Sequence, residues 1–154
     1  MTTVQLTCEV VAYNSDSYRQ MVALRNAVLR IPLGKTLTAE EIERDAQLVH
    51  LAAFDNAKQV VATALLQNVA DSQEAIQVRQ VAVAPSLQKT GVGAALMAFA
   101  EAEARKQSYH TMILHARDVA VPFYMRIGYH TVGDYFEETG IPHIHMEKSL
   151  TPQV

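Results

Sequence analysis

The sequence predicts one domain of the α/β (α+β) class, with a mixed sheet of about seven strands and about four helices. Three observations lead to this fold class. Short apolar and partly β-branched runs recur along the chain, segments with the helical apolar repeat lie between them, and neither a linker nor an internal repeat divides residues 1–154. A chain of 154 residues is also long enough to bury a proper core.

The N-terminal third is expected to hold a strand followed by two helices. An apolar run predicts the strand at 4–13, and the Asn-Ser-Asp turn after it can cap a helix over 16–29. The "IPLG" stretch at 31–34 ends that helix, because proline disfavours a helical predecessor. Thr38 and Glu41 have the spacing of a capping box, which predicts a short second helix.

The middle of the chain predicts a hairpin followed by an irregular strand. Apolar runs at 48–54 and 59–67 flank a short turn and predict two antiparallel strands. In the next strand, at 74–83, the apolar positions change phase at Arg79 and Gln80. Such a phase change indicates a bulge or a splay in that strand.

A glycine-containing loop, "QKTGVG" at 88–93, joins that strand to a helix over 91–106. The start of a helix leaves N–H groups unpaired, the helix dipole adds partial positive charge, and glycine lets a ligand approach the backbone. These features predict an anion site suited to a pyrophosphate, to which Gln88 and Lys89 can add side-chain donors. The alternative is a tight connection that binds nothing, since neither the dinucleotide fingerprint nor the P-loop motif is complete.

The C-terminal third predicts three strands and one helix. The expected elements are a strand at 111–115, a helix at 120–127, and strands at 131–136 and 143–148. Glu137 and Glu138 are expected in the loop between the last two strands, where exposed carboxylates are common. His143 and His145 share one face of a strand, but the sequence places no third ligand beside them. We therefore predict no metal and a role for these histidines in a pocket or the core.

Composition argues against two classes of protein. A net charge of -3 argues against a general nucleic-acid binder, and no apolar stretch is long enough to cross a membrane. The single cysteine, Cys8, and the absence of a basic leader favour a cytoplasmic location. Cys8 is expected to be a small buried hydrophobic residue.

Two motifs resemble the GNAT superfamily of N-acetyltransferases. The loop at 88–93 is similar to its Q/R-x-x-G-x-G/A acyl-CoA signature, and "AVPFYMRIGY" at 120–129 is similar to its A-x-x-F-Y-x-x-x-G-F element. Both stand in the family's order, and "ALRNAVLRIPLG" with "YFEETGIPHIHMEKSL" resembles its ElaA-like bacterial branch. The resemblance covers nearly the whole chain and implies a mainly antiparallel sheet that splays at its fourth and fifth strands. Two departures are Arg117, where many relatives carry asparagine, and Tyr129 for the usual phenylalanine.

The resemblance implies transfer of an acetyl group from acetyl-CoA to a primary amine of a small molecule or a protein. Backbone N–H groups of the loop hold the pyrophosphate, the fourth strand pairs with the pantetheine amides, and one of its N–H groups polarises the thioester carbonyl. The coenzyme-binding residues expected on this basis are Val81, Ala82, Val83, Gln88, Lys89, Thr90, Gly91, Val92, Gly93, Ala94, Arg117 and Tyr124. Dimers are common among similar proteins, so a homodimer is a further expectation.

The reaction requires an acid for the departing thiolate and a base for the amine. Tyr124 is the expected acid, because a phenol with an ordinary pKa of about 10 is protonated at neutral pH. Its alternative role is that of a packing aromatic. His115 is the first candidate for the base, and a base can also act through water. The other candidates are His110, His143, His145, Glu137 and Glu138.

Three alternatives stay open at this point. The protein could bind acyl-CoA without turnover, as a sensor or a structural subunit, or it could be a metal-dependent enzyme built on His143 and His145. Arg25 and Arg30 could face a cleft for an acidic acceptor or lie on the surface. The sequence does not identify the acceptor amine.

Overall fold

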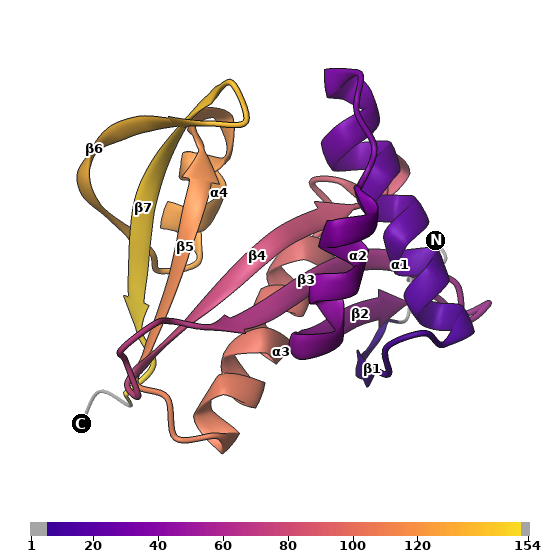
Figure 1. Cartoon of the computed structure of the whole chain (residues 1–154). Helices are drawn as coiled ribbons and strands as arrows, with labels where there is room; N and C mark the ends of the chain where they lie inside the picture. Colours follow the sequence, from indigo (N-terminus) through magenta and orange to yellow (C-terminus); the bar gives the residue numbers. More distant parts are fainter. Residues whose placement is uncertain (1–5, 152–154) are drawn as a thin grey trace. The chain divides into compact units, whose positions relative to one another are not determined.

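The computed structural model describes residues 6–151, and within them seven strands form a mixed sheet in the order β1-β2-β3-β4-β5-β7-β6 (Figure 1). The strands are β1 (Thr7–Val11), β2 (Val49–Phe54), β3 (Val60–Asn68), β4 (Ala75–Val83), β5 (Thr111–Arg117), β6 (His130–Glu138) and β7 (Ile141–Ser149). The α-helices are α1 (Asp16–Arg25), α2 (Ala39–Arg44), α3 (Val92–Lys106) and α4 (Val121–Arg126). The predicted fold class is confirmed. The start of the first predicted strand, at residues 4 and 5, lies outside the described residues.

Strand pairing is antiparallel between β1 and β2, β2 and β3, β5 and β7, and β6 and β7. The parallel pair is β4 with β5, from Ala75 opposite Thr111 to Gln77 opposite Ile113. Two compact units divide the chain. The first unit is Met1–Gln67 with Gln80–Ala100, and the second unit is Asn68–Arg79 with Glu101–Val154. None of the helices in residues 6–151 combines the length and hydrophobicity that a bilayer crossing requires.

In the first unit, local signals set the ends of the helices. The Ser15 side chain accepts from the Tyr18 N–H at 3.1 Å and caps α1, and Thr38 with Glu41 forms the predicted capping box of α2. After α1 the chain makes a π-helical turn and a short 3-10 turn, which ends at Gly34 with a φ of +71°. Glycine suits this left-handed position because it has no Cβ.

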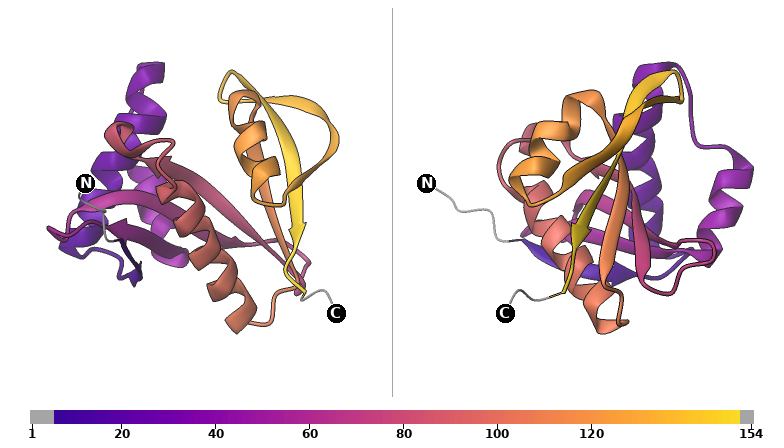
Figure 2. Two further views of the ribbon diagram at one scale, coloured as in Figure 1. Left: turned by 180° about the vertical axis from the view of Figure 1, so that it is seen from behind. Right: turned by 90° about the vertical axis from the view of Figure 1, so that its left-hand side faces the viewer.

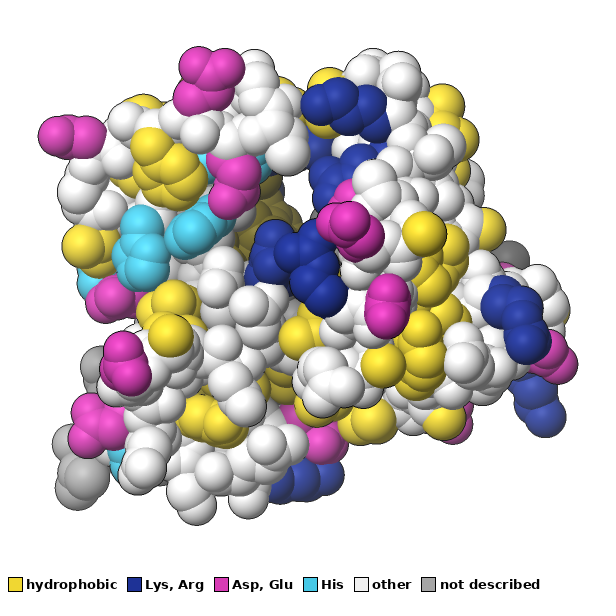
Figure 3. Space-filling model, in the orientation of Figure 1, with side chains coloured by type: hydrophobic (Ala, Val, Ile, Leu, Met, Phe, Trp, Pro, Cys, Tyr) yellow, Lys and Arg dark blue, Asp and Glu magenta, His cyan; other side chains and the backbone are white. Residues whose placement is uncertain are grey.

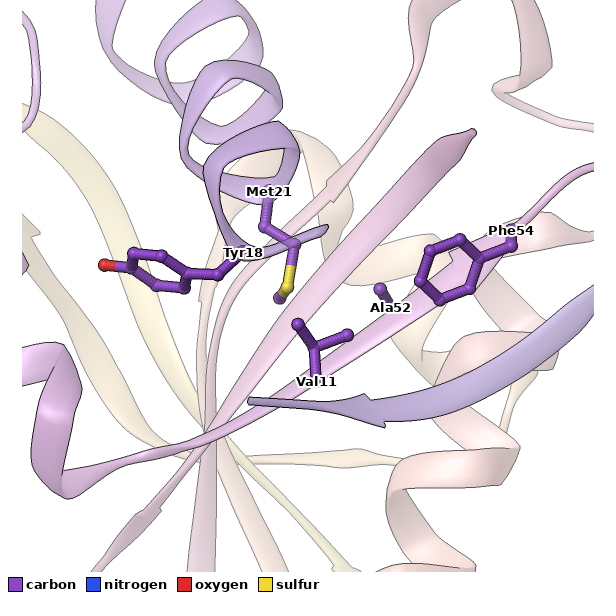
Figure 4. Packing of buried hydrophobic residues seen from close by; sticks show 5 residues of the cluster. All are labelled: Val11, Tyr18, Met21, Ala52 and Phe54. Carbon is purple, nitrogen blue, oxygen red and sulfur yellow. The ribbon is translucent and has the colours of Figure 1, made fainter. Parts of the chain in front are cut away.

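The core of the first unit includes a cluster between α1 and the strands. α1 and α2 lie on one face of β2 and β3, and the first turns of α3 lie on the other (Figure 2). Figure 4 shows Met21 of α1 pointing toward Val11 of β1 and Ala52 of β2. The buried members of this cluster are Val11, Tyr18, Met21, Ala52 and Phe54. Cys8 is half-buried rather than buried, because β1 is an edge strand of the sheet.

In the second unit, the last two strands are longer than predicted. β6 and β7 are joined by a two-residue turn at Thr139 and Gly140, whose φ angles are +52° and +76°. Such left-handed pairs form tight hairpins, so pairing continues to Glu138 opposite Ile141. The prediction that Glu137 and Glu138 lie in a loop is therefore wrong, since both belong to β6.

Candidate functional site

The loop that precedes α3 contains two left-handed residues. A short 3-10 turn, Pro85–Leu87, follows β4, and Lys89 and Gly91 then have φ angles of +65° and +94°. α3 begins at Val92, and the Ala95 N–H donates to the Gly91 carbonyl at 3.0 Å. The first N–H groups of a helix have no acceptor within the helix itself, so this is an arrangement that can bind an anion.

Side chains of the loop hold its own backbone. Gln88 Nε2 donates to the Val83 carbonyl at 3.1 Å, which ties the loop to the end of β4, and the Thr90 hydroxyl donates to the Leu87 carbonyl. A Cβ placed on Gly91 would meet no atom within 4 Å. Open space therefore lies beside the backbone at the position where the sequence predicts a pyrophosphate.

β4 is irregular at Gln80, which has a φ of +53° within the strand. This confirms the irregularity predicted at Arg79 and Gln80. The buried positions nevertheless keep one phase through it, so Val81 and Val83 lie on the less buried face. The buried side chains of the strand are those of Ile76, Val78 and Ala82.

A buried ion pair lies beside this irregularity. The Arg25 side chain is 0% exposed, and its Nη1 contacts Asp45 Oδ2 at 2.7 Å. The Tyr18 hydroxyl donates to the same oxygen at 2.6 Å, and Arg25 Nε donates to Gln80 Oε1 at 2.8 Å. His50 Nε2 donates to the Asp45 backbone carbonyl at 2.7 Å, which fixes its tautomer. Burial raises the pKa of Tyr18 and lowers the pKa of His50, so both groups are neutral near pH 7.

Arg25 therefore has neither of the roles considered from the sequence, and Arg30 is partly buried in an ion pair. The Arg25 side chain is fully buried, so it faces neither a cleft nor the surface, and its guanidinium pairs with the Asp45 carboxylate. Arg30 Nη2 contacts Glu41 Oε2 at 2.7 Å, which ties the π-helical turn to α2.

In the second unit, Tyr124 lies on α4 and is buried. Its ring packs against those of Phe123 and Tyr129, with distances of 5.0 Å and 5.9 Å between the ring centroids. Burial raises the pKa of Tyr124 to about 12. The phenol is therefore protonated throughout the physiological range and can act as a hydrogen-bond donor.

A second buried carboxylate accounts for the tyrosine that replaces the family's usual phenylalanine. The Tyr129 hydroxyl donates to Glu101 Oε2 at 2.9 Å, and Lys148 Nζ contacts Glu101 Oε1 at 2.8 Å. Lys148 Nζ also donates to the Ile127 carbonyl at 2.8 Å, just after α4. Burial and the Glu101 carboxylate raise the pKa of Tyr129, so its hydroxyl acts only as a neutral donor.

Histidine and carboxylate side chains gather on β5, β6 and β7. His115 Nδ1 lies 3.3 Å from Glu138 Oε1, and His143 Nε2 lies 3.6 Å from Glu138 Oε2. The His115 ring meets the Phe136 ring edge-on, with 5.1 Å between the ring centroids. The centroids of the His115 and His145 rings are 5.7 Å apart. Figure 3 shows histidine side chains beside one another on this face. Glu138 thus bridges two histidines from different strands.

The two histidines of β7 differ in their surroundings. His143 is buried, and its Nδ1 donates to the Ile141 carbonyl at 2.8 Å. His145 is partly exposed, and its Nε2 lies 3.0 Å from Glu147 Oε1. Across residues 6–151, no group of three or more His, Cys, Asp or Glu side chains is placed to hold a metal ion.

Comparison with known proteins decides the family. A family model described as an acetyltransferase (GNAT) domain matches residues 26–150. The chain belongs to the GNAT family of acetyltransferases. It is similar to the uncharacterized N-acetyltransferase YjcF of Bacillus subtilis, with 27% identity over 144 residues that cover 90% of this chain and 97% of that protein.

Solved structures share the GNAT fold. The chain matches the crystal structure of Escherichia coli ElaA with a TM-score of 0.76 and 24% identity, over 95% of this chain and 99% of that one. It matches an aminoglycoside 6'-N-acetyltransferase complexed with coenzyme A with a TM-score of 0.79 and 18% identity, over 96% and 99% of the two chains. The predicted GNAT resemblance and the prediction of an acyltransferase are confirmed.

The GNAT motifs occupy distinct elements of the structure. The expected coenzyme residues 81–83 lie at the end of β4, and residues 88–94 lie in the loop and first turn of α3, all in the first unit. Tyr124, His115 and Arg117 lie on α4 and β5 of the second unit. Of the other base candidates, Glu138 and His143 join His115, whereas His110 precedes β5 and its backbone N–H donates to the Glu74 carbonyl.

Sequence reasoning missed Asp45, His50 and Glu101 of this GNAT domain. A signal for Arg25 was present, because it follows Tyr18 and Met21 at helical spacing on the face that packs against the sheet. A charged residue on an apolar face requires a buried partner, but nothing local pointed to Asp45. Glu101 similarly lies buried on α3, and nothing in the local sequence pointed to its partners Tyr129 and Lys148.

Proposed function

We propose that this GNAT protein transfers an acetyl group from acetyl-CoA to a primary amine of a small molecule or a protein. The observation that carries the proposal is the loop before α3, where two left-handed residues and open space at Gly91 suit a pyrophosphate. The aminoglycoside 6'-N-acetyltransferase of similar fold is complexed with coenzyme A, which supports the same class of donor.

The donor is assigned to backbone groups and a few side chains. The N–H groups from Gln88 to Ala94 bind the pyrophosphate, and the backbone of Val81, Ala82 and Val83 pairs with the pantetheine arm. Glycine at position 91 supports this assignment, because a side chain there would occupy the space that the phosphates need. Arg117 is assigned a further contact with the pantetheine arm.

The reaction is direct attack of the neutral amine on the thioester carbonyl carbon. The carbon–nitrogen bond forms, the carbon–sulfur bond breaks, and the coenzyme A thiolate leaves. Tyr124 donates a hydrogen bond to that sulfur. Its pKa of about 12 lies above the value of about 8.5 for a model thiol, so the bond stabilises the thiolate while the phenol keeps its proton.

His115 is assigned to accept the proton of the amine. Its Nδ1 faces Glu138 at 3.3 Å, and donation of that N–H to the carboxylate leaves the lone pair on Nε2. The ring is partly exposed, so water or an amine can reach it. Glu138 orients the ring and stabilises the imidazolium that forms when the proton is taken.

Calorimetric titration with acetyl-CoA tests the proposal, with NAD as the control ligand. We expect acetyl-CoA to bind and NAD to give no heat of binding, which would justify a screen of amine acceptors. If folded protein binds no acetyl-CoA, the loop is only a turn and the proposed enzyme activity is wrong.

A matched pair of glycine variants locates the binding to the loop. Gly91 and Gly34 both have left-handed φ angles with open space beside them, so alanine strains the backbone to a similar degree at each. We expect Gly91→Ala to weaken acetyl-CoA binding by about tenfold and Gly34→Ala to leave the affinity unchanged. Equal affinities for the two variants would contradict the loop assignment.

The Tyr124→Phe variant separates the enzyme from a non-catalytic sensor. Removing the hydroxyl should lower kcat by about 100-fold with an accepted amine while the Kd for acetyl-CoA stays the same. A sensor or structural subunit would bind acetyl-CoA with no turnover of any amine by the wild-type protein.

Light scattering of the purified protein tests the homodimer that the resemblance predicts.

A further inference from the structure

Gln80 takes a backbone conformation that a strand residue with a side chain rarely adopts. Its φ of +53° places it in the left-handed region, where the Cβ is crowded by the backbone. Such a conformation costs free energy and persists only where the surroundings impose it. It stands immediately before Val81, the first of the three residues assigned to the pantetheine arm.

The surroundings of Gln80 supply that constraint through its side chain. Arg25 Nε donates to Gln80 Oε1 at 2.8 Å, and the Arg25 side chain is 0% exposed. Arg25 is itself fixed by Asp45, which accepts from Nη1 at 2.7 Å and from the Tyr18 hydroxyl at 2.6 Å. The guanidinium is thus held by a carboxylate on one side and holds Gln80 on the other.

The segment after Gln80 is fixed again at its far end. The Ala84 N–H donates to the Val61 carbonyl of β3 at 2.8 Å, and Gln88 Nε2 donates to the Val83 carbonyl. Residues 81–83 therefore lie between two anchors, one made by a side chain and one made by the backbone. A short segment held at both ends loses little conformational freedom when a ligand binds to it.

We propose that Arg25 and Gln80 are positioning residues, which hold β4 in its left-handed kink so that the backbone of residues 81–83 is preorganised for acyl-CoA. This inference rests on the proposed function. Arg25 is suited to the task because its guanidinium offers Nε in one direction and the Nη pair in another, which a lysine cannot do. Asp45 and Tyr18 act indirectly, because Asp45 holds Arg25 in place and Tyr18 bonds to Asp45.

Variants at Gln80 test the proposal against a matched change at Gln77 of the same strand. Gln80→Leu removes the acceptor for Arg25, Gln80→Glu keeps one, and Gln77→Leu makes the same chemical change at another half-buried position. We expect Gln80→Leu to weaken acetyl-CoA binding by about tenfold, with Gln80→Glu and Gln77→Leu within about twofold of wild type. Calorimetry on folded protein measures these affinities.

Gln80→Gly provides a second variant in case leucine disturbs folding. Glycine accepts the left-handed conformation but offers no side chain to Arg25, so the kink becomes allowed without being held. We expect the same loss of affinity as for Gln80→Leu. Unchanged acetyl-CoA affinity in folded Gln80→Leu or Gln80→Gly protein would overturn the proposal.

Hydrogen exchange distinguishes this inference from the proposed function. The amides of residues 81–84 should exchange faster in Gln80→Gly than in Gln77→Leu if the side chain holds the kink. Wild-type protein that fails to bind acetyl-CoA would refute the proposed function, while faster exchange would still support the restraint by Arg25. Equal exchange in the two variants would refute the restraint even if wild type binds acetyl-CoA.

Discussion

Each of the two units buries a carboxylate that is held by one tyrosine and one cation, but the cations differ. In the first unit, Asp45 accepts from Tyr18 at 2.6 Å and pairs with Arg25 at 2.7 Å. In the second unit, Glu101 accepts from Tyr129 at 2.9 Å and pairs with Lys148 at 2.8 Å. The same chemical solution therefore satisfies a buried charge twice in one chain.

The difference lies in solvent and in the third partner of each cation. The Arg25 side chain is 0% exposed and bonds to the Gln80 side chain, whereas the Lys148 side chain is 25% exposed and bonds to the Ile127 backbone carbonyl. An arginine can serve two partners in the plane of its fork without water, but an ammonium is compact and strongly hydrated. The first network is therefore shielded from solvent, and the second is open to solvent at Lys148.

The largest expected effect separates the two networks by their exposure. Arg25→Met leaves a buried carboxylate without its cation and should lower the free energy of unfolding by about 3–5 kcal/mol. Lys148→Met should cost about 1–2 kcal/mol, because Lys148 is 25% exposed and water can replace part of its interaction with Glu101. Urea unfolding followed by circular dichroism measures both. Equal losses would mean that the two ion pairs are equally shielded from solvent.

Removing both charges of the first pair sharpens the comparison. Arg25→Met combined with Asp45→Leu replaces an ion pair by apolar groups, so the double variant should regain at least about 2 kcal/mol relative to Arg25→Met alone. The double variant should nevertheless bind acetyl-CoA more weakly than wild type, because Gln80 has lost the hydrogen bond from Arg25. A double variant that is no more stable than Arg25→Met would show that the desolvated carboxylate is not the cause of the loss.

The two regions also differ in how well the sequence predicted them. The loop at 88–93 was predictable because the glycines, the helix start and the preceding strand are neighbours in sequence, and the structure places two left-handed residues there. The Glu138 bridge was not predictable, because it joins β5, β6 and β7 through long-range pairing. The tight turn at Thr139 and Gly140 extended β6 and moved Glu138 from an expected loop onto a strand.

The Arg25 network illustrates the same limit. From the sequence, Arg25 was expected at a cleft or on the surface, because its partners Asp45 and Gln80 stand 20 and 55 residues further along the chain. The change in the apolar pattern at Gln80 was visible in the sequence, whereas the Arg25 side chain that bonds to Gln80 was not. Local geometry is therefore encoded locally, and the restraint on it depends on the tertiary fold.

The tyrosines provide a smaller test of the same comparison. Tyr18→Phe and Tyr129→Phe each remove one donor from a carboxylate and should cost about 1–2 kcal/mol of unfolding free energy. The loss should be greater for Tyr18, since the cation beside Asp45 is 0% exposed whereas the cation beside Glu101 is 25% exposed. Thermal unfolding of both variants beside wild type measures the difference. A greater loss for Tyr129→Phe would mean that the Glu101 site, rather than the Asp45 site, is the better shielded from solvent.

The smallest expected effect is an acid sensitivity that His50 gives to the first network. Burial lowers the pKa of His50 below its ordinary value, and its Nδ1 is buried without a hydrogen-bond partner. The unfolded chain therefore binds a proton at His50 before the folded protein does, so stability is full above about pH 6.5 and falls below it. His50→Gln keeps a donor for the Asp45 carbonyl but cannot titrate. Between pH 7 and 5.5, wild type should lose up to about 1 kcal/mol more unfolding free energy than His50→Gln, as measured by urea unfolding. Parallel losses in the two proteins would show that groups other than His50 account for the acid sensitivity.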